Sequence, residues 1–326
     1  EIVRLIGSGG MGAVYEATDR RLGRRVALKQ MTVNGEKFEQ AFAHEARLLA
    51  ALSHANLPNV FDHFSDEQGH FLVMEYIPGD DLHEALKKQG TPFPVEQVLR
   101  WADQLLDVLD YLHTQADPII HRDIKPANIK VVKDTVKLLD FGLTKGTPDF
   151  LTHYHLSSVT GYTIKYAPPE QIRAKATDAR SDLFSLAATL YCLLTGSDPV
   201  DVPTRWEALG EHDPDPLQSP CKLNPQIPAV VGDLLLQAMA MSHTRRPATA
   251  DRMRQALRAS YPALWQTGGN GAGTQQAIGN IASNQGGQGN FFGNVTFNYG
   301  TPDAAAAQQR WLFIGMAVLA MIGVVA

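Results

Sequence analysis

A glycine-rich run near the start of the chain has the residue types that could contact phosphate groups. Residues 7–14 read GSGGMGAV and follow the spacing G-x-G-x-x-G-x-V. Glycine has no side chain, so its backbone can approach triphosphate oxygens closely. The spacing alone is weak, because dinucleotide-binding folds share it and open a helix directly after the glycines. Here residues 14–17 continue in strand-like alternation, so we expect a phosphate-binding hairpin.

A single lysine lies in the next strand-like run, Val26-Ala27-Leu28-Lys29. The run is apolar enough to be buried, and a buried ammonium group needs a counter-charge. Glu45 lies beside the apolar face of the helical stretch 37–53, so we expect an ion pair between Lys29 and Glu45. The alternative is a lysine that extends to solvent from an edge strand.

The clearest pattern is the string HRDIKPAN at residues 121–128, followed by Asp140-Phe141-Gly142 after a strand-like run at 136–139. With these motifs the sequence resembles the protein kinases, specifically the eukaryotic-like Ser/Thr kinases of bacteria. The resemblance runs in order from Gly7 to Pro247, which is most of the globular part. It implies ATP and Mg²⁺ as cofactors.

The resemblance also assigns roles to the polar residues of these motifs. Phosphoryl transfer has a loose transition state, so the protein mainly positions groups and neutralises charge. Asp123 is then expected to accept and orient the incoming hydroxyl, and Lys125 to steady the γ-phosphate. Asn128 and Asp140 are expected to hold Mg²⁺ through oxygen ligands, and Lys29 to hold the α- and β-phosphates.

The nucleotide contacts follow from the same resemblance. We expect adenine between the lobes, packed against Val14 and Ala27, with Met74 at the back of the pocket and Leu139 nearby. Its polar edge is expected to meet backbone groups of Glu75 and Ile77, and Asp81 to reach the ribose. The family usually has an apolar residue under the adenine where this chain has Lys130. The residues expected to contact ATP are Gly7, Ser8, Gly9, Gly10, Met11, Gly12, Val14, Ala27, Lys29, Glu75, Ile77 and Asp81.

Two residues indicate the Ser/Thr class of kinase. Lys125 resembles the family's mark of Ser/Thr specificity, and Thr163 resembles the threonine that these kinases place beside that lysine. The peptide platform at residues 163–170 departs from the family, because Pro168 stands where alanine is usual. The shape of this platform is therefore open.

Three further residues resemble structural positions of the family. Glu170 is expected to form a buried ion pair with Arg246 that anchors the helical lobe. Asp182 is expected to brace the backbone of the catalytic loop.

Regulation by phosphorylation is expected on the segment 143–162. Arg122 directly precedes the expected base, and kinases with this arginine are often switched by a phosphate on that segment. Such a phosphate would gain charge-assisted hydrogen bonds. The candidate acceptors are Thr152, Ser157, Ser158 and Thr160.

Composition excludes some classes of protein. The chain has 326 residues and a formal net charge of -5. It lacks the basic footprint of nucleic-acid binding, so nucleic acid is not an expected partner. The two cysteines have no paired or metal-binding spacing, which indicates a reduced, cytosolic catalytic part.

The elements that position these residues form an α+β, two-lobed protein kinase fold. Residues 1–76 alternate strand-like runs with one helical stretch, which predicts a small β-rich N-lobe. Helical patterns dominate residues 77–265, the expected C-lobe. Residues 266–310, rich in Gly, Asn and Gln, are expected to be a flexible linker.

The apolar run at 311–326 is expected to be a transmembrane helix cut short, since a span needs about 20 residues. A buried core helix is the alternative. We expect a single-pass protein of the cell membrane with a cytoplasmic kinase domain, and Arg310 agrees with that orientation. Expected partners are the lipid bilayer, protein substrates with Ser/Thr acceptors, and a transient homodimer for autophosphorylation in trans.

Two other functions stay open at this point. A nucleotide-binding pseudokinase scaffold would bind ATP without transferring phosphate, but Lys29, Asp123, Asn128 and Asp140 are all present. A small-molecule kinase would share the fold, but the peptide platform at 163–170 argues against it.

Overall fold

The computed structural model describes residues 1–9, 12–31, 36–140 and 163–265. Residues Glu1–Asn270 form one compact unit. The expected linker at 266–310, the apolar run at 311–326 and the candidate phosphorylation sites at 152–160 lie outside the described residues. Within the described ranges, no helix combines the length and apolar character needed to cross a membrane.

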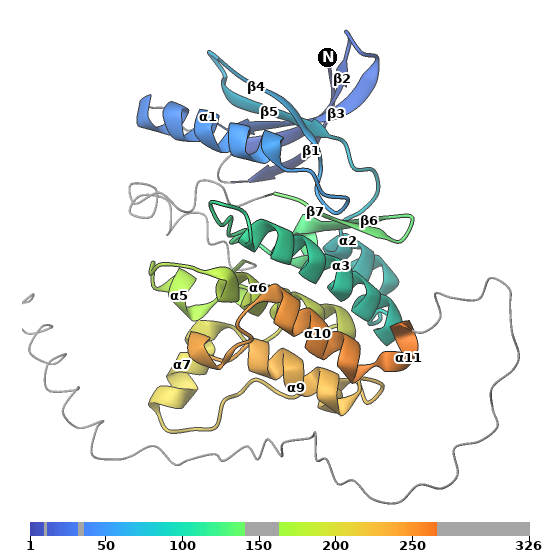
Figure 1. Cartoon of the computed structure of the whole chain (residues 1–326), viewed down its shortest axis with the longest axis vertical. Coiled ribbons are helices and arrows are strands. Elements are labelled where there is room, and N and C mark those ends of the chain that lie inside the picture. The colour runs from blue at the N-terminus through green and yellow to red at the C-terminus, as the bar shows by residue number, and fades with distance from the viewer. Residues whose placement is uncertain (10–11, 32–35, 141–162, 266–326) are drawn as a thin grey trace, which may run out of the picture. The chain divides into compact units, whose positions relative to one another are not determined.

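The N-lobe is a five-stranded sheet in the order β1-β2-β3-β5-β4, and every neighbouring pair is antiparallel. Figure 1 shows this sheet with one helix packed on it, above the helical lobe. The prediction of a small sheet that carries one helix is confirmed. The strands are β1 (Ile2–Gly9), β2 (Gly12–Asp19), β3 (Arg24–Met31), β4 (Val60–Asp66) and β5 (Gly69–Glu75).

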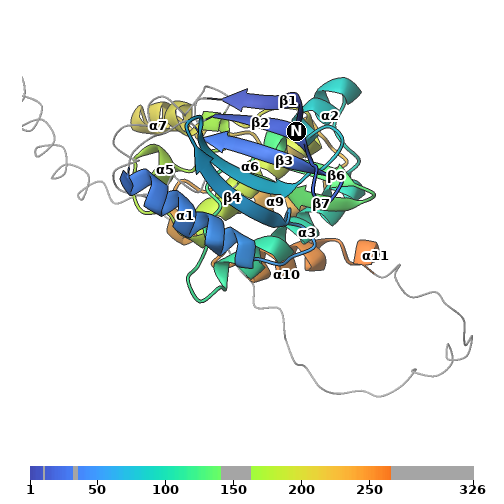
Figure 2. The same ribbon diagram turned by 90° about the horizontal axis from the view of Figure 1, so that it is seen from above.

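Helix α1 (Glu36–Ala51) contacts strands β4 and β5, and Figure 2 shows it alongside the sheet. Its residues Phe42, Ala46 and Leu49 are buried and belong to the same core as Leu72 of β5. They recur at helical spacing, so one stripe of the helix faces the sheet. This packing fixes the helix against the strands.

The C-lobe is built around α6 (Ala179–Thr195), in which every residue from Ser181 onward is buried. Asp178 begins this helix with a capping box, because its side chain and that of Ser181 bond reciprocally to backbone amides. The other helices are α2 (Leu82–Gln89), α3 (Val95–His113), α5 (Pro169–Ile172), α7 (Val202–Gly210), α8 (Pro220–Leu223), α9 (Ala229–Ala238), α10 (Ala250–Ser260) and α11 (Pro262–Trp265).

A short hairpin, β6 (Ile129–Val132) and β7 (Thr135–Leu138), follows the catalytic string. The segment between α1 and β4 is tied to it by Asn56, whose Nδ2 donates to the Val136 carbonyl at 2.7 Å. The Leu138 amide in turn donates to the Asn56 carbonyl at 2.8 Å. These bonds connect the N-lobe to the part of the C-lobe that carries the expected site.

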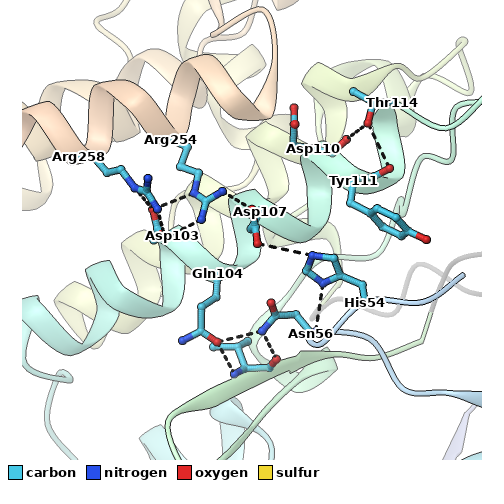
Figure 3. Close-up of polar contacts among 11 residues, drawn as sticks. His54, Asn56, Asp103, Gln104, Asp107, Asp110, Tyr111, Thr114, Arg254 and Arg258 are labelled. Carbon is cyan, nitrogen blue, oxygen red and sulfur yellow. Dashed lines mark hydrogen bonds and ion pairs between the residues drawn. The ribbon is translucent and has the colours of Figure 1, made fainter. Parts of the chain in front are cut away.

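A charged cluster joins α10 to α3 on the side of the C-lobe (Figure 3). Asp103 accepts hydrogen bonds from Arg254 and Arg258, and Arg254 also pairs with Asp107. His54 Nε2 lies 3.6 Å from the Asp107 carboxylate. The cluster therefore holds the last long helix against α3 and reaches the segment between α1 and β4.

Candidate active site

The glycine-rich run forms a hairpin, because Gly9 and Gly12 pair across the end of β1 and β2. Gly12 has φ 145°, and a Cβ atom built there would lie 1.8 Å from the Gln30 carbonyl oxygen. Only glycine fits this position. Gly10 and Met11 lie outside the described residues.

The walls of the expected base pocket come from cross-strand neighbours. Ala27 of β3 is paired with Met74 of β5, and Val14 of β2 is paired with Lys29. Cross-strand partners and alternate residues of a strand share one face of a sheet, so these four side chains lie on the same face. A pocket behind Met74 is lined by apolar side chains together with Lys29 and Asp140.

The segment after β5 is contacted by two lysines of the β6–β7 hairpin. Lys130 Nζ donates to the Ile77 carbonyl at 3.0 Å. Lys137 Nζ lies 3.3 Å from the Glu75 carboxylate. Burial lowers the pKa of Lys130, while the carboxylates of Asp81 and Asp80 act in the opposite direction. The contacts of both lysines were missed at the sequence level, although the unusual identity of residue 130 was noted.

Asp81, expected at the ribose, is the N-cap of α2. Its Oδ1 accepts hydrogen bonds from the His83 and Glu84 amides, each at 3.0 Å. These bonds orient the carboxylate. The Oδ2 atom of Asp81 is thereby held at the N-terminus of α2.

Asp123 lies in a cluster with Lys125 and Asn128. Lys125 Nζ is 3.1 Å from Asp123 Oδ2, and Asn128 Nδ2 donates to the same oxygen at 2.9 Å. Asn128 Nδ2 also donates to the Asp123 backbone carbonyl at 2.7 Å. The amide nitrogen of Asn128 is thus used within the loop, which leaves its side-chain oxygen as a ligand atom.

Lys29 and Asp140 form an ion pair, with Nζ 2.7 Å from Oδ1. The Lys29 ammonium lowers the pKa of Asp140 and outweighs the opposite effect of burial. Strand β3 lies in the interior of the sheet, so the alternative of an edge-strand lysine is wrong. Glu45 lies in α1, but its side chain is outside the described residues, so the pair with Lys29 stays a prediction.

The oxygen atoms near Asp123 and Asp140 fit a divalent metal that is shared with phosphate groups. Asn128 and Asp140 each offer a hard oxygen ligand, and the Leu139 amide donates to the Asn128 carbonyl at 2.8 Å, which holds their backbones together. Among the described residues there is no cluster of three or more His, Cys, Asp or Glu that could hold a metal alone. Mg²⁺ is commonly held by one or two protein oxygens plus substrate phosphates, which suits this donor set.

Asp182 is fully buried and accepts hydrogen bonds from the catalytic loop. Its two carboxylate oxygens accept hydrogen bonds from the His121 and Arg122 amides, each at 2.8 Å. Its Oδ2 also lies 2.8 Å from His113 Nε2. Burial alone would raise the pKa of Asp182, but the bonds from His113 and the backbone outweigh it and keep the pKa below its ordinary value. The predicted position of Asp182 at the loop backbone is therefore present in the structure.

The backbone of Arg122 has φ 64°, a left-handed conformation that is uncommon for arginine. The Asp182 bond holds its amide, and Gln171 Nε2 donates to its carbonyl at 2.9 Å. Gln171 and His113 were missed at the sequence level, since nothing in a lone glutamine or histidine indicates a contact with a distant loop. The Arg122 side chain bonds to Thr177 Oγ1 at 2.9 Å.

The ion pair between Glu170 and Arg246 is also present. Arg246 donates from Nη1 and Nη2 to the two carboxylate oxygens, at 2.7 and 3.0 Å. Ser181 Oγ adds a bond of 2.7 Å to Glu170. Burial would raise the pKa of Glu170, but the Arg246 and Ser181 bonds hold it below its ordinary value. Pro168 is the N-cap of the short helix α5 that carries Glu170.

Comparison with known proteins agrees with this geometry. A probable serine/threonine-protein kinase of Clostridium perfringens is 35% identical over 254 residues, covering 77% of this chain and 36% of that protein. Serine/threonine-protein kinase PrkC of Bacillus subtilis is 32% identical over 267 residues, covering 81% and 40%. The chain thus spans well under half the length of these relatives. The PknI kinase domain of Mycobacterium tuberculosis has a similar fold, with a TM-score of 0.62 at 23% identity, covering 79% of this chain and 95% of that chain.

The family model "protein kinase domain" matches residues 1–261. That range contains the N-lobe with its glycine hairpin, the catalytic string and the C-lobe as far as the end of α10. The chain therefore belongs to the protein kinase domain family.

Proposed function

We propose that this chain is a protein kinase that transfers the γ-phosphate of ATP to serine and threonine hydroxyls of proteins. The observation that carries the proposal is the cluster in which Lys125 and Asn128 hydrogen-bond the Asp123 carboxylate. The names of the bacterial relatives support the Ser/Thr class.

The residues of the cluster have complementary tasks in the transfer. Asp123 accepts the proton of the incoming hydroxyl and orients its oxygen. Lys125, held 3.1 Å from that carboxylate, brings a positive charge to the side where the γ-phosphate meets the hydroxyl. Lys29 provides the charge for the α- and β-phosphates from the interior of the sheet.

Asn128 and Asp140 are the side chains that would hold Mg²⁺. A metal held by these residues would neutralise the negative charge of the phosphates. The hydrogen bond from Asn128 Nδ2 to the Asp123 carboxylate supports a role for the two residues side by side, Asn128 as metal ligand and Asp123 as base. In this proposal Lys125 is the residue that indicates Ser/Thr specificity, and Thr163 would lie beside it. The Thr163 side chain lies outside the described residues.

The test is the variant Asp123→Asn, compared with wild type in a labelled-ATP assay on a mixed peptide library. Loss of the base should lower the transfer rate by about 10²–10⁴, while ATP binding is retained. Asp134→Asn, in the exposed turn of the β6–β7 hairpin, is the matched control. A wild-type chain that binds ATP but transfers no more phosphate than Asp123→Asn would be a pseudokinase scaffold. Label on tyrosine instead of serine or threonine would refute the Ser/Thr class.

The proposal includes a tether and a location. The apolar residues 311–326 would enter the lipid bilayer and keep the kinase lobes on the cytoplasmic side, where ATP is. The composition of that segment and Arg310 before it support this. Membrane fractionation of the chain with and without residues 266–326 tests it, and recovery of both forms in the soluble fraction would contradict it.

Regulation would use autophosphorylation in trans, through a transient homodimer, on Thr152, Ser157, Ser158 or Thr160. The placement of Arg122 directly before Asp123 supports a phosphate-dependent switch. Mass-spectrometric mapping after incubation with ATP and Mg²⁺ tests it. Active enzyme without label between residues 143 and 162 would contradict it.

A further inference from the structure

Two lysines of the β6–β7 hairpin extend to the segment that follows β5. Lys130 and Lys137 are directly opposite each other in the hairpin, so their side chains lie on one face of it. Like charges at such positions repel each other. Each ammonium is compensated by its own acceptors: Lys130 by the Ile77 carbonyl, and Lys137 by the Leu57 carbonyl at 3.0 Å and the Glu75 carboxylate.

Lys130 is held at both its backbone and its side chain. Its backbone forms an isolated β-bridge with Asp81, and its ammonium donates to Ile77. The half-buried side chain of Lys130 therefore runs from Asp81, which is expected at the ribose, to Ile77, which is expected at the edge of the base. Residue 130 is also the position that the family resemblance places under the adenine.

The bond from Lys130 changes which backbone groups of Ile77 can hydrogen-bond a ligand. Among the described residues the Ile77 amide has no hydrogen-bond partner, so it is available as a donor. The Ile77 carbonyl already accepts from Lys130. Its second lone pair could be approached only beside the ammonium, where another N–H donor would be repelled.

We propose that Lys130 is a specificity-determining residue that excludes purine nucleotides with an amino group at C2, because its ammonium occupies the Ile77 carbonyl. The inference rests on the proposed function and on the expectation that the polar edge of the base meets backbone groups of Glu75 and Ile77. Adenine offers a ring nitrogen as acceptor to the Ile77 amide and has only hydrogen at C2. A 2-amino group next to that nitrogen would be a donor aimed at an occupied carbonyl and a cation.

The test compares two nucleotides that differ only in this group. The dissociation constants of ATP and of 2,6-diaminopurine riboside triphosphate are measured with Mg²⁺ by calorimetry on the full chain. Wild type should bind ATP at least about tenfold more tightly, the usual size of the penalty for a polar group without a partner. In Lys130→Met, which keeps the length of the side chain but has no ammonium, the ratio should fall to within about threefold of unity.

The matched control is Lys137→Met, which removes the opposite lysine of the same hairpin and should keep the wild-type ratio. Lys130→Arg keeps a cation and should also keep the preference for ATP. Thermal melting without nucleotide establishes that each variant is folded, and Lys130→Leu is the second variant without an ammonium.

The outcomes separate this inference from the proposed function. A wild-type chain that binds neither nucleotide would refute the kinase proposal. Binding of ATP with a wild-type ratio near unity, or a ratio unchanged in Lys130→Met and Lys130→Leu, would refute the role of Lys130 alone. If the ratio of dissociation constants also falls to near unity in Lys137→Met, the role of Lys130 is refuted, because a general loosening of the β6–β7 hairpin would then be the cause.

Discussion

Lys29 Nζ lies 2.7 Å from Asp140 Oδ1, although the two residues are 111 positions apart in the chain. The lysine extends from the interior strand β3, and the aspartate follows the β6–β7 hairpin of the other lobe. Asp140 has φ 54°, an uncommon conformation for a residue with a side chain. The pair therefore joins a cation of one lobe to a carboxylate of the other, and this carboxylate is the one proposed to bind the metal.

Replacing Lys29 tests the importance of this pair. Lys29→Met should lower the rate of phosphate transfer by about 10²–10³, because a positioned positive charge for the phosphates is lost. Transfer from labelled ATP to the peptide library measures it. Lys88→Met is the control, since Lys88 forms a pair with Asp80 at 2.6 Å on the exposed surface of α2. An unchanged rate in Lys29→Met would exclude the lysine from the phosphate site.

The partner of Lys29 shows what the sequence could and could not predict. The apolar run at 26–29 correctly predicted a lysine that needs a counter-charge, and the strand-helix order suggested Glu45. Asp140 was known only as a metal-binding candidate, because its approach to β3 depends on how the lobes close on each other. Local patterns contain no information on that closure.

The contacts of Lys130 were beyond prediction for a related reason. The sequence indicated an unusual residue in the floor of the pocket, but not where its ammonium points. That direction depends on the register of the β6–β7 hairpin, in which Lys130 is opposite Lys137. A shift of one residue would turn both lysines to the other face.

The glycine hairpin makes a stability prediction with an internal control. Gly12→Ala should lower the melting temperature, because the new Cβ would lie 1.8 Å from the Gln30 carbonyl oxygen at a φ of 145°. In Gly7→Ala the new Cβ has no neighbour within 4 Å, so stability should stay within about 0.5 kcal/mol of wild type. Differential scanning calorimetry measures both. Equal melting temperatures for the two variants would contradict the close approach at Gly12.

Asp182 accepts hydrogen bonds from the backbone amides of His121 and Arg122, directly before the proposed base Asp123. Asp182→Asn replaces one acceptor oxygen with an amide group that would face a backbone N–H, so the His121 and Arg122 amides should exchange with solvent faster. We expect a lower kcat with little change in the KM for ATP. Hydrogen exchange of the loop and steady-state kinetics measure the two effects. A change in KM alone, with unchanged exchange, would argue against this role.

The Glu170–Arg246 pair should contribute to stability and not to chemistry. Arg246→Ala leaves the partly buried Glu170 carboxylate with its Ser181 bond but without its arginine partner, which should cost up to about 3–5 kcal/mol of unfolding free energy. The arginine also donates to the Ala240 carbonyl at 2.9 Å, so part of this loss is independent of Glu170. Urea denaturation of the single variants at Glu170 and at Arg246, and of the double variant, separates the energy of the ion pair from the other contributions of each side chain. Additive losses would show that the two side chains are not coupled.

The cluster of Figure 3 predicts how stability depends on pH. Burial would raise the pKa of Asp103, but the hydrogen bonds from Arg254 and Arg258 outweigh it and lower the pKa in the folded state. An unfolded aspartate titrates near about 3.9. The stabilisation is therefore complete above that pH and is lost as the pH falls through the folded pKa.

Asp103→Asn should then lower the unfolding free energy at pH 7 by about 1.5–3 kcal/mol, the usual value for hydrogen bonds to charged groups. Between pH 5 and the acid limit of folding it should lose less stability than wild type, since the titrating group is absent. Asp80→Asn is the matched control, because its pair with Lys88 is exposed and surface pairs contribute about 0–1 kcal/mol. Urea titrations at a series of pH values give the slope of unfolding free energy against pH for wild type and for Asp103→Asn. Equal acid slopes for wild type and Asp103→Asn would mean that the arginines do not depress the pKa of Asp103.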